Sequence, residues 1–126
     1  MNIKNIINYC KKKIINDQKK DGHWVYELEA DTTIPSEYIL MNHFLGITEK
    51  KLETRLAKYI KKEQNQDGGW PLFWKGESNI STSVKAYYAL KLSGEKETSS
   101  IMLKAKKKIL DLGAVSYTHL TLPTKA

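Results

Sequence analysis

One seven-residue pattern occurs twice in this chain, and it constrains the fold more than any other feature. Residues 18–24 and 64–70 both read Gln-x-x-Asp-Gly-x-Trp. Their tryptophans, Trp24 and Trp70, lie 46 positions apart (70 − 24). A separation of this size is typical of stacked helical repeats. The sequence therefore predicts that one structural unit is used at least twice.

Hydrophobic periodicity predicts an all-α fold of about five helices. Apolar residues recur at spacings of three, four and seven, and glycine-containing turns separate the periodic segments. The first, third and fifth segments are amphipathic, whereas the second and fourth are apolar nearly all round, which predicts burial. We expect the amphipathic segments to form an outer layer and the apolar ones an inner layer, as in an α/α toroid. The segments are residues 2–18, 33–46, 48–64, 81–94 and 98–112.

The residue types of the repeated pattern indicate a structural role. A glutamine at a helix end can bond to backbone groups left unpaired there, a glycine permits the turn, and a tryptophan supplies a large apolar face. A plain helix end with a core tryptophan would explain one copy. Two copies in register indicate a clasp between neighbouring helical hairpins. The structural repeat residues are Gln18, Gly22, Trp24, Gln64, Gly68 and Trp70.

The net charge of +7 does not indicate nucleic-acid binding here. Nearly all of the positive charge is lysine, and Arg55 is the only arginine, although arginine is favoured for bidentate contacts to phosphates and bases. The lysines also lie in helical segments, which indicates solvated outer faces. Attraction to an anionic membrane surface stays open as the functional alternative.

Few residues suggest metal or redox chemistry. Cys10 is the only cysteine, so an internal disulfide is excluded and a reducing, cytosolic compartment is favoured. The carboxylates of residues 27, 29 and 31 do not match the spacing of a calcium loop. Cys10, His23 and His43 do not form a convincing ligand set. We expect no metal and no cofactor, and we see neither a membrane-spanning run nor a secretory signal.

The two copies and their flanks resemble a known family. Residues 18–24 and 64–70 look like the glutamine-tryptophan repeats of the triterpene cyclases, and residues 21–38, 68–73 and 83–91 resemble the N-terminal region of squalene-hopene cyclases. The resemblance runs from about residue 5 to Gly113. It covers only the first part of a much longer family, so we expect the chain to be a fragment.

This resemblance implies a fold and an activity. The family folds as two α/α barrels and cyclises squalene to hopene or hopanol without a cofactor, in bacterial hopanoid biosynthesis. An aspartic acid in an Asp-x-Asp-Asp motif protonates the substrate, and aromatic rings stabilise the carbocations. That motif does not occur in this sequence. We therefore expect the chain to be inactive without the missing C-terminal barrel. In full length we expect a peripheral, monotopic protein on the cytoplasmic side of the membrane, and a homodimer.

One residue of the active site is implied by the resemblance. Glu37, in a Pro-Ser-Glu-Tyr stretch, matches a family glutamate in the polar pocket where the last cation loses a proton or takes up water. A helix-start carboxylate that interacts with backbone N–H groups is the structural alternative. Some family members have a second acidic residue where this sequence has Lys85. This departure puts a pair of carboxylates in doubt.

The character of the sequence changes near its end. Residues 1–114 follow the repeat pattern, whereas residues 115–126 lose the lysine-rich helical pattern and resemble a translated sequencing adapter. We expect this tail to be non-native and to pack weakly, with a short natural β-prone tail as the alternative. Its residues are excluded from our fold prediction.

Two other functions compete with a cyclase. A protein prenyltransferase subunit shares the α/α barrel, but it would need an Asp, Cys and His zinc set for which no residues here are suited. A non-catalytic helical-repeat module could bind a partner through its lysine-rich face. A downstream Asp-x-Asp-Asp motif in the complete gene would separate the cyclase from both.

Overall fold

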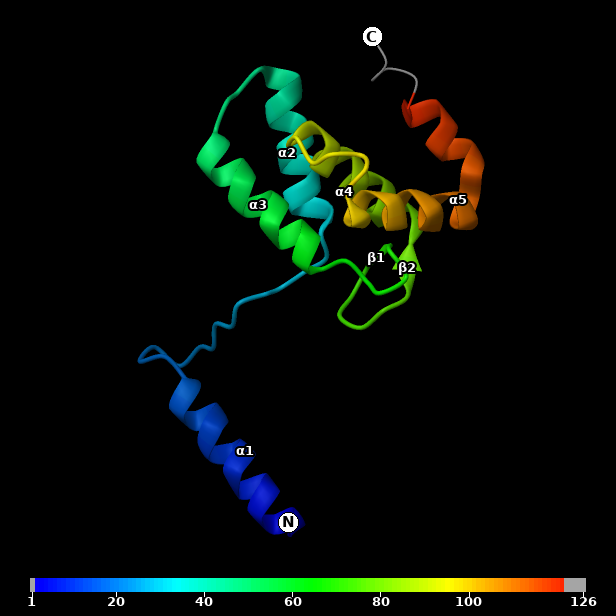
Figure 1. The fold of residues 1–126 in the computed structure, drawn as a ribbon. Helices are drawn as coiled ribbons and strands as arrows, with labels where there is room; N and C mark the ends of the chain where they lie inside the picture. The colour runs from blue at the N-terminus through cyan, green and yellow to red at the C-terminus, as the bar shows by residue number, and fades with distance from the viewer. Residues whose placement is uncertain (1, 122–126) are drawn as a thin grey trace.

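A computed structural model of the protein describes residues 2–121 as five α-helices and one short antiparallel ribbon (Figure 1). The all-α class and the partial α/α toroid predicted from the sequence are confirmed. The predicted helix positions agree with the observed bounds except at the chain end. The elements are α1 (Ile3–Asp17), α2 (Thr33–Leu45), α3 (Lys50–Lys62), β1 (Trp70–Pro71), β2 (Ser78–Asn79), α4 (Ile80–Leu92) and α5 (Ser100–Thr121).

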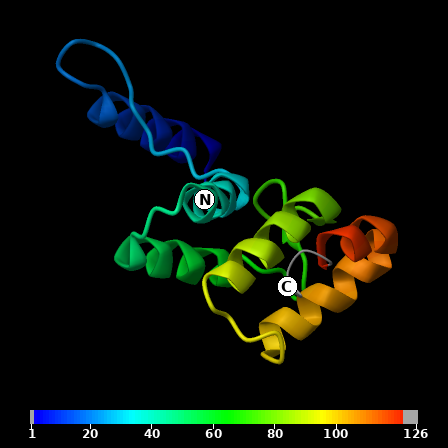
Figure 2. The ribbon, with the colours of Figure 1, turned by 90° about the horizontal axis from the view of Figure 1, so that it is seen from above.

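Helix α4 is the centre of the packed region. It packs against α2, α3, α5 and the ribbon, and Figure 2 shows α4 between the α2–α3 hairpin and α5. Its small residues Ala86 and Ala89 are fully buried, which lets the neighbouring helices approach closely. The buried apolar core draws on α2 to α5 and on the ribbon: Ile39, Ala57, Ile60, Trp70, Ala86, Tyr87, Ala89, Leu90, Met102, Ala105 and Ile109.

Local chemistry explains where the central helices begin and end. The Asn79 side chain accepts hydrogen bonds from the backbone N–H groups of Ser81 and Thr82, which caps α4 at its start. Helix α2 ends at Gly46, whose φ of 69° lies in the left-handed region that glycine tolerates. These signals are readable in the sequence, and they agree with the predicted boundaries.

Helix α1 departs from the predicted alternation of layers. It forms over the expected residues, but it has no buried residue and lies away from the helices of the packed region (Figure 1). Its apolar stripe is exposed: Ile3 is 73% and Ile7 is 59% accessible. Amphipathic spacing fixes the face that a helix can bury, but it does not supply the partner. Within the described residues, the apolar face of α1 therefore stays unpacked.

Helix α2 is less buried than its composition suggests. Ser36, Ile39 and Asn42 face the core. The opposite side exposes Ile34 and Phe44, which are 68% and 88% accessible. An apolar helix needs neighbours on every side to be buried, and within residues 2–121 α2 packs mainly against α3 and α4. The prediction of a fully buried second helix is therefore wrong here.

The ribbon and the end of α5 also differ from the sequence-based expectation. Strand β1 pairs with β2 in antiparallel register, with Trp70 opposite Asn79, where the sequence suggested only a loop. The helical backbone continues to Thr121, interrupted at Gly113 by an extended φ of 169°. The side chains of residues 114–121 are not described. Residues 122–126 of the expected tail lie outside the described residues.

Candidate functional site

The two copies of the repeat have the same local hydrogen bonds. Gln18 Nε2 donates to the Gly22 carbonyl oxygen over 2.7 Å, and Gln64 Nε2 donates to that of Gly68 over 2.8 Å. Both glycines have positive φ, 93° and 96°. These values require glycine at the turn. The pattern therefore encodes a turn closed by its own glutamine.

The tryptophans of the two copies also make equivalent bonds. Trp24 Nε1 donates to the carbonyl oxygen of Ile14, and Trp70 Nε1 to that of Ile60, each over 2.7 Å. Each acceptor lies ten residues before its tryptophan, in the last turn of the preceding helix. Carbonyls at a helix C-terminus have no partner within the helix. The indole therefore ties each turn back to the helix that precedes it.

The second copy is docked into the core. Gln64 Nε2 donates a second bond, 3.0 Å long, to the carbonyl oxygen of Ile101 at the start of α5. The Trp70 backbone N–H donates to Ser83 Oγ on α4 over 2.9 Å, and the Trp70 side chain is fully buried. Gly68 lies against the Lys104 backbone, so a Cβ would overlap that carbonyl oxygen. This copy joins α3, α4 and α5.

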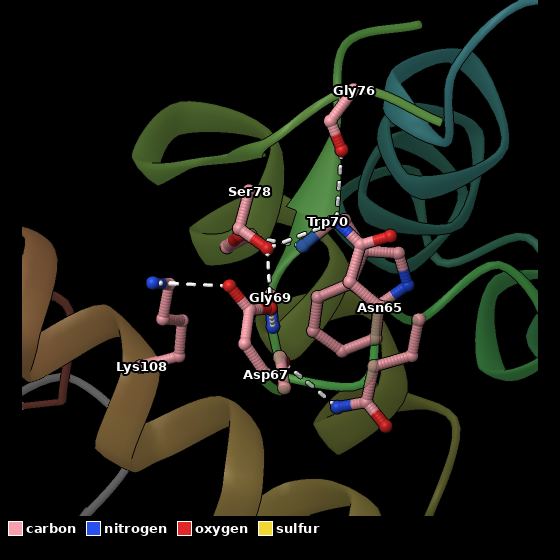
Figure 3. A network of polar contacts seen from close by, with 10 residues as sticks. Asn65, Asp67, Gly69, Trp70, Gly76, Ser78 and Lys108 are labelled. Atoms are coloured by element: carbon pink, nitrogen blue, oxygen red, sulfur yellow. Dashed lines mark hydrogen bonds and ion pairs between the residues drawn. The ribbon is translucent and has the colours of Figure 1, made fainter. Parts of the chain in front are cut away.

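A polar network fixes the turn of the second copy (Figure 3). Asp67 Oδ1 accepts hydrogen bonds from Ser78 Oγ at 2.6 Å and from the Gly69 backbone N–H at 3.1 Å. Its other oxygen, Oδ2, lies 3.0 Å from Lys108 Nζ on α5. Partial burial acts to raise the pKa of Asp67, but these hydrogen bonds and the lysine hold it below its ordinary value. The carboxylate is thus a structural anchor.

The first copy lacks the equivalent long-range contacts in the described residues. Trp24 is 44% exposed, whereas Trp70 is 0% exposed. Ser36, in the first turn of α2, is the counterpart in the first repeat of Ser83, in the first turn of α4. Ser36 is fully buried, and its hydroxyl has no hydrogen-bond partner in the part of the chain that the structure describes, whereas Ser83 Oγ accepts the Trp70 N–H. The first clasp is formed locally but is not docked.

Glu37 lies where two neighbouring helices face each other. Its Oε1 is 2.8 Å from Lys85 Nζ, which links α2 to α4 across the interface of these two helices. The Glu37 side chain is 49% exposed and that of Lys85 is 37% exposed. The lysine that stands in place of a second carboxylate is therefore the partner of Glu37.

The surroundings of Glu37 on α2 are apolar and accessible. Positions 34, 37, 41, 44 and 45 share one side of the helix, since they follow its three- and four-residue spacing. All five residues are exposed, and Glu37 is the only charged one among them. The stripe therefore presents apolar side chains with one carboxylate at their centre. Its apolar members are Ile34, Met41, Phe44 and Leu45.

The loop carboxylates have structural contacts. Glu29 Oε1 accepts a hydrogen bond from the Tyr59 hydroxyl over 3.2 Å, and Asp31 accepts from the backbone N–H of Thr33. Burial, with neighbouring carboxylates including Glu29, raises the pKa of Tyr59 to about 12. Over residues 2–121, no group of three or more His, Cys, Asp or Glu side chains could hold a metal ion. Nor does any described helix have the length and hydropathy for a bilayer crossing.

Comparison with known proteins shows which family this chain belongs to. A sequence model of the squalene-hopene cyclase N-terminal domain matches residues 7–123. This chain belongs to the squalene-hopene cyclase family. It is 43% identical over 109 residues to squalene-hopene cyclase of Zymomonas mobilis and 44% identical over 108 residues to squalene-hopene cyclase of Schizosaccharomyces japonicus. These matches cover 86% and 85% of this chain.

The family relatives are much longer and more diverse than this chain. The chain spans 17% of the Zymomonas relative and 16% of the Schizosaccharomyces one. A dammaradiene synthase of the fern Dryopteris crassirhizoma is 32% identical over 107 residues, which are 85% of this chain and 16% of that relative. Because eukaryotic proteins are among the relatives, the match alone does not assign a bacterial source. The relatives also carry names for different triterpene products.

The structure brings together only part of the predicted residue set. Gln64, Gly68 and Trp70 meet in one docked clasp, whereas Gln18, Gly22 and Trp24 form a separate exposed one. Glu37 lies apart from both, on α2, where it pairs with Lys85 of α4. Sequence reasoning missed Ser83, Lys108 and the pairing of Lys85 with Glu37. A serine at the start of the second helix of each repeat was a usable signal for Ser83, whereas Lys85 and Lys108 were two lysines among many.

Proposed function

We propose that this chain is the N-terminal part of a triterpene cyclase that converts squalene to hopene or hopanol by acid-initiated carbocation cyclisation. Membership of the squalene-hopene cyclase family supports this proposal. The chain contains no Asp-x-Asp-Asp motif, so the proton that starts the reaction comes from another part of the complete protein. The chain alone is inactive under this proposal.

The residue of this chain proposed to act in the reaction is Glu37. The observation that carries this role is the apolar stripe of α2 (Ile34, Met41, Phe44 and Leu45), in which Glu37 is the only charged side chain. A hydrocarbon substrate suits an apolar wall, and a carboxylate there favours nearby positive charge. Glu37 accepts the proton lost by the last cation, directly or through a bound water.

The complete protein has further proposed properties. Its missing C-terminal barrel is the partner that completes the cavity, and it needs neither a metal nor an organic cofactor. It lies on the cytoplasmic side of the membrane as a peripheral, monotopic homodimer, and it does not bind nucleic acid. The apolar side chains left exposed on α1 and α2 are compatible with further chain packing there.

The decisive experiment is expression of the complete gene with squalene, followed by lipid analysis. We expect hopene or hopanol from the complete protein and no cyclised product from residues 1–114 alone. The complete gene is also expected to encode a downstream Asp-x-Asp-Asp motif and more glutamine-tryptophan repeats. A natural stop codon near residue 114 would defeat the proposal. A product from another linear substrate would overturn the squalene assignment and leave the cyclase class intact.

A further inference from the structure

The ion pair between Glu37 and Lys85 changes what the carboxylate can do. Lys85 Nζ lies 2.8 Å from Glu37 Oε1, so one carboxylate oxygen is occupied by a charged donor. Among the described residues the second oxygen, Oε2, has no partner, so it can accept a proton or a hydrogen bond from another group. An ammonium has three N–H donors, and the bond to Glu37 uses one of them. The pair can therefore hold a water molecule that contacts both charges.

The pair lies beside the apolar stripe of α2. The two side chains come from adjacent helices, and both are partly accessible, 49% for Glu37 and 37% for Lys85. The α2 residues on either side of Glu37 on this stripe, Ile34 and Met41, are apolar. A polar molecule beside this wall would find its hydrogen-bond partners at the pair. A water bound there would be fixed in place.

We propose that Lys85 is a positioning residue that sets the ratio of alcohol to alkene product. This inference rests on the proposed function, in which Glu37 acts at the last cation. Lys85 holds Glu37 by one oxygen and anchors a water beside it. For the alcohol, the water oxygen gives a lone pair to the cationic carbon, a C–O bond forms, and a water proton passes to Glu37 Oε2.

The competing outcome needs no water. A C–H bond next to the cationic carbon breaks, its electrons form the C=C bond of the alkene, and the proton passes to Glu37. Without the ammonium, the carboxylate has no charged partner and the water loses a donor. The rate of direct proton loss then rises relative to the rate of water addition. Removal of the Lys85 charge is therefore expected to shift the products toward alkene.

The test compares lysine variants of the complete protein with squalene as substrate. In Lys85→Met, we expect the alcohol-to-alkene ratio to fall by about tenfold, the change typical of losing one charge-assisted hydrogen bond. Lys85→Arg, which keeps a donor and the charge, should retain most of the parent ratio. Lys91→Met is the matched control, because Lys91 is on the same helix and pairs with Glu97 instead. Its ratio should equal that of the parent.

The outcomes separate this inference from the proposed function. A parent protein that makes no cyclised product defeats the proposed function, and the Lys85 role falls with it. A parent that cyclises squalene while Lys85→Met keeps the parent ratio overturns the Lys85 role alone. If Lys85→Met does not fold, Lys85→Gln is measured instead, and an unchanged ratio in it is equally contradictory. A shift in Lys91→Met of the same size would also overturn the assignment, because it would trace the effect to charge on α4 in general.

Discussion

The Trp70 indole nitrogen donates a 2.7 Å hydrogen bond to the carbonyl oxygen of Ile60, and both side chains are fully buried. This bond joins the turn of the second repeat to the last turn of α3. Trp24 makes the same bond to Ile14 from a 44% exposed position. The chain thus contains one clasp geometry in two environments, which allows the effect of burial to be measured.

Replacing each tryptophan by phenylalanine tests that difference. Trp70→Phe leaves the Ile60 carbonyl in the core without its donor, and we expect a loss of about 1–3 kcal/mol in the free energy of unfolding. Trp24→Phe should cost less than about 1 kcal/mol, because water can replace the exposed donor. Urea unfolding of the chain followed by circular dichroism measures both. Equal losses would contradict the assignment of a docked and an undocked clasp.

The turn glycine of the docked clasp should tolerate no side chain. Gly68 has a φ of 96°, and a Cβ there would overlap the Lys104 carbonyl oxygen. Gly68→Ala should therefore cost more than the roughly 1–2 kcal/mol of left-handed backbone strain alone. Gly46→Ala is the matched control, since φ is 69° with nothing within 4 Å of the added Cβ. Thermal unfolding that ranks Gly46→Ala as the worse variant would refute the close packing of Gly68 on α5.

The anchor at Asp67 predicts a specific dependence on pH. Its pKa is lowered in the folded protein from an ordinary 3.8, so the ionised form is favoured by folding. The stabilisation is fully present above that ordinary value and is lost as the pH falls through the folded-state pKa. Asp67→Asn should lower stability at neutral pH by about 1 kcal/mol, allowing for solvent screening of a partly exposed side chain. It should also flatten the acid limb of the stability curve.

Urea midpoints taken from neutral pH to below 3.8 give this curve. Asp111→Asn, on the exposed side of α5, serves as the control and should keep the acid limb of the parent. An acid limb that is equally steep in Asp67→Asn would show that other carboxylates cause it. The network of Ser78, Gly69 and Lys108 would then contribute little through ionisation of Asp67.

The Glu37–Lys85 pair should couple weakly to stability. Both side chains are more than a third exposed, and exposed ion pairs contribute about 0.2–1 kcal/mol. A double-mutant cycle of Glu37→Gln and Lys85→Met in this chain should give a coupling energy within that range, smaller at high salt. A coupling several times larger would mean that the pair serves mainly to hold α2 against α4. A role in the reaction would then lose its support.

Much of the fold is readable from the sequence because its signals are local. Apolar spacing and the glycine-containing turns predicted the helices to within a few residues, and the twin patterns predicted two turns of the same kind. Nothing local distinguishes the docked copy from the exposed one. Docking depends on whether another helix offers a carbonyl, as Ile101 does for Gln64. This is a property of packing, which periodicity does not encode.

The candidate site shows the same limit. Glu37 was identified by its resemblance to a family stretch, and Lys85 was noted only as a departure from the family. Their pairing follows from the register between α2 and α4, 48 positions apart in the sequence. A register between two apolar helices is set by how their side chains interlock. The sequence therefore drew attention to both residues but did not predict that they form an ion pair.

Incubation of the complete protein with squalene, with product identification by mass spectrometry, tests the central claim most directly. The claim is that these residues form the N-terminal part of a squalene-cyclising enzyme. It predicts a pentacyclic alkene or alcohol from the complete protein and none from residues 1–114. Recovery of unchanged squalene from a folded, complete protein would contradict it.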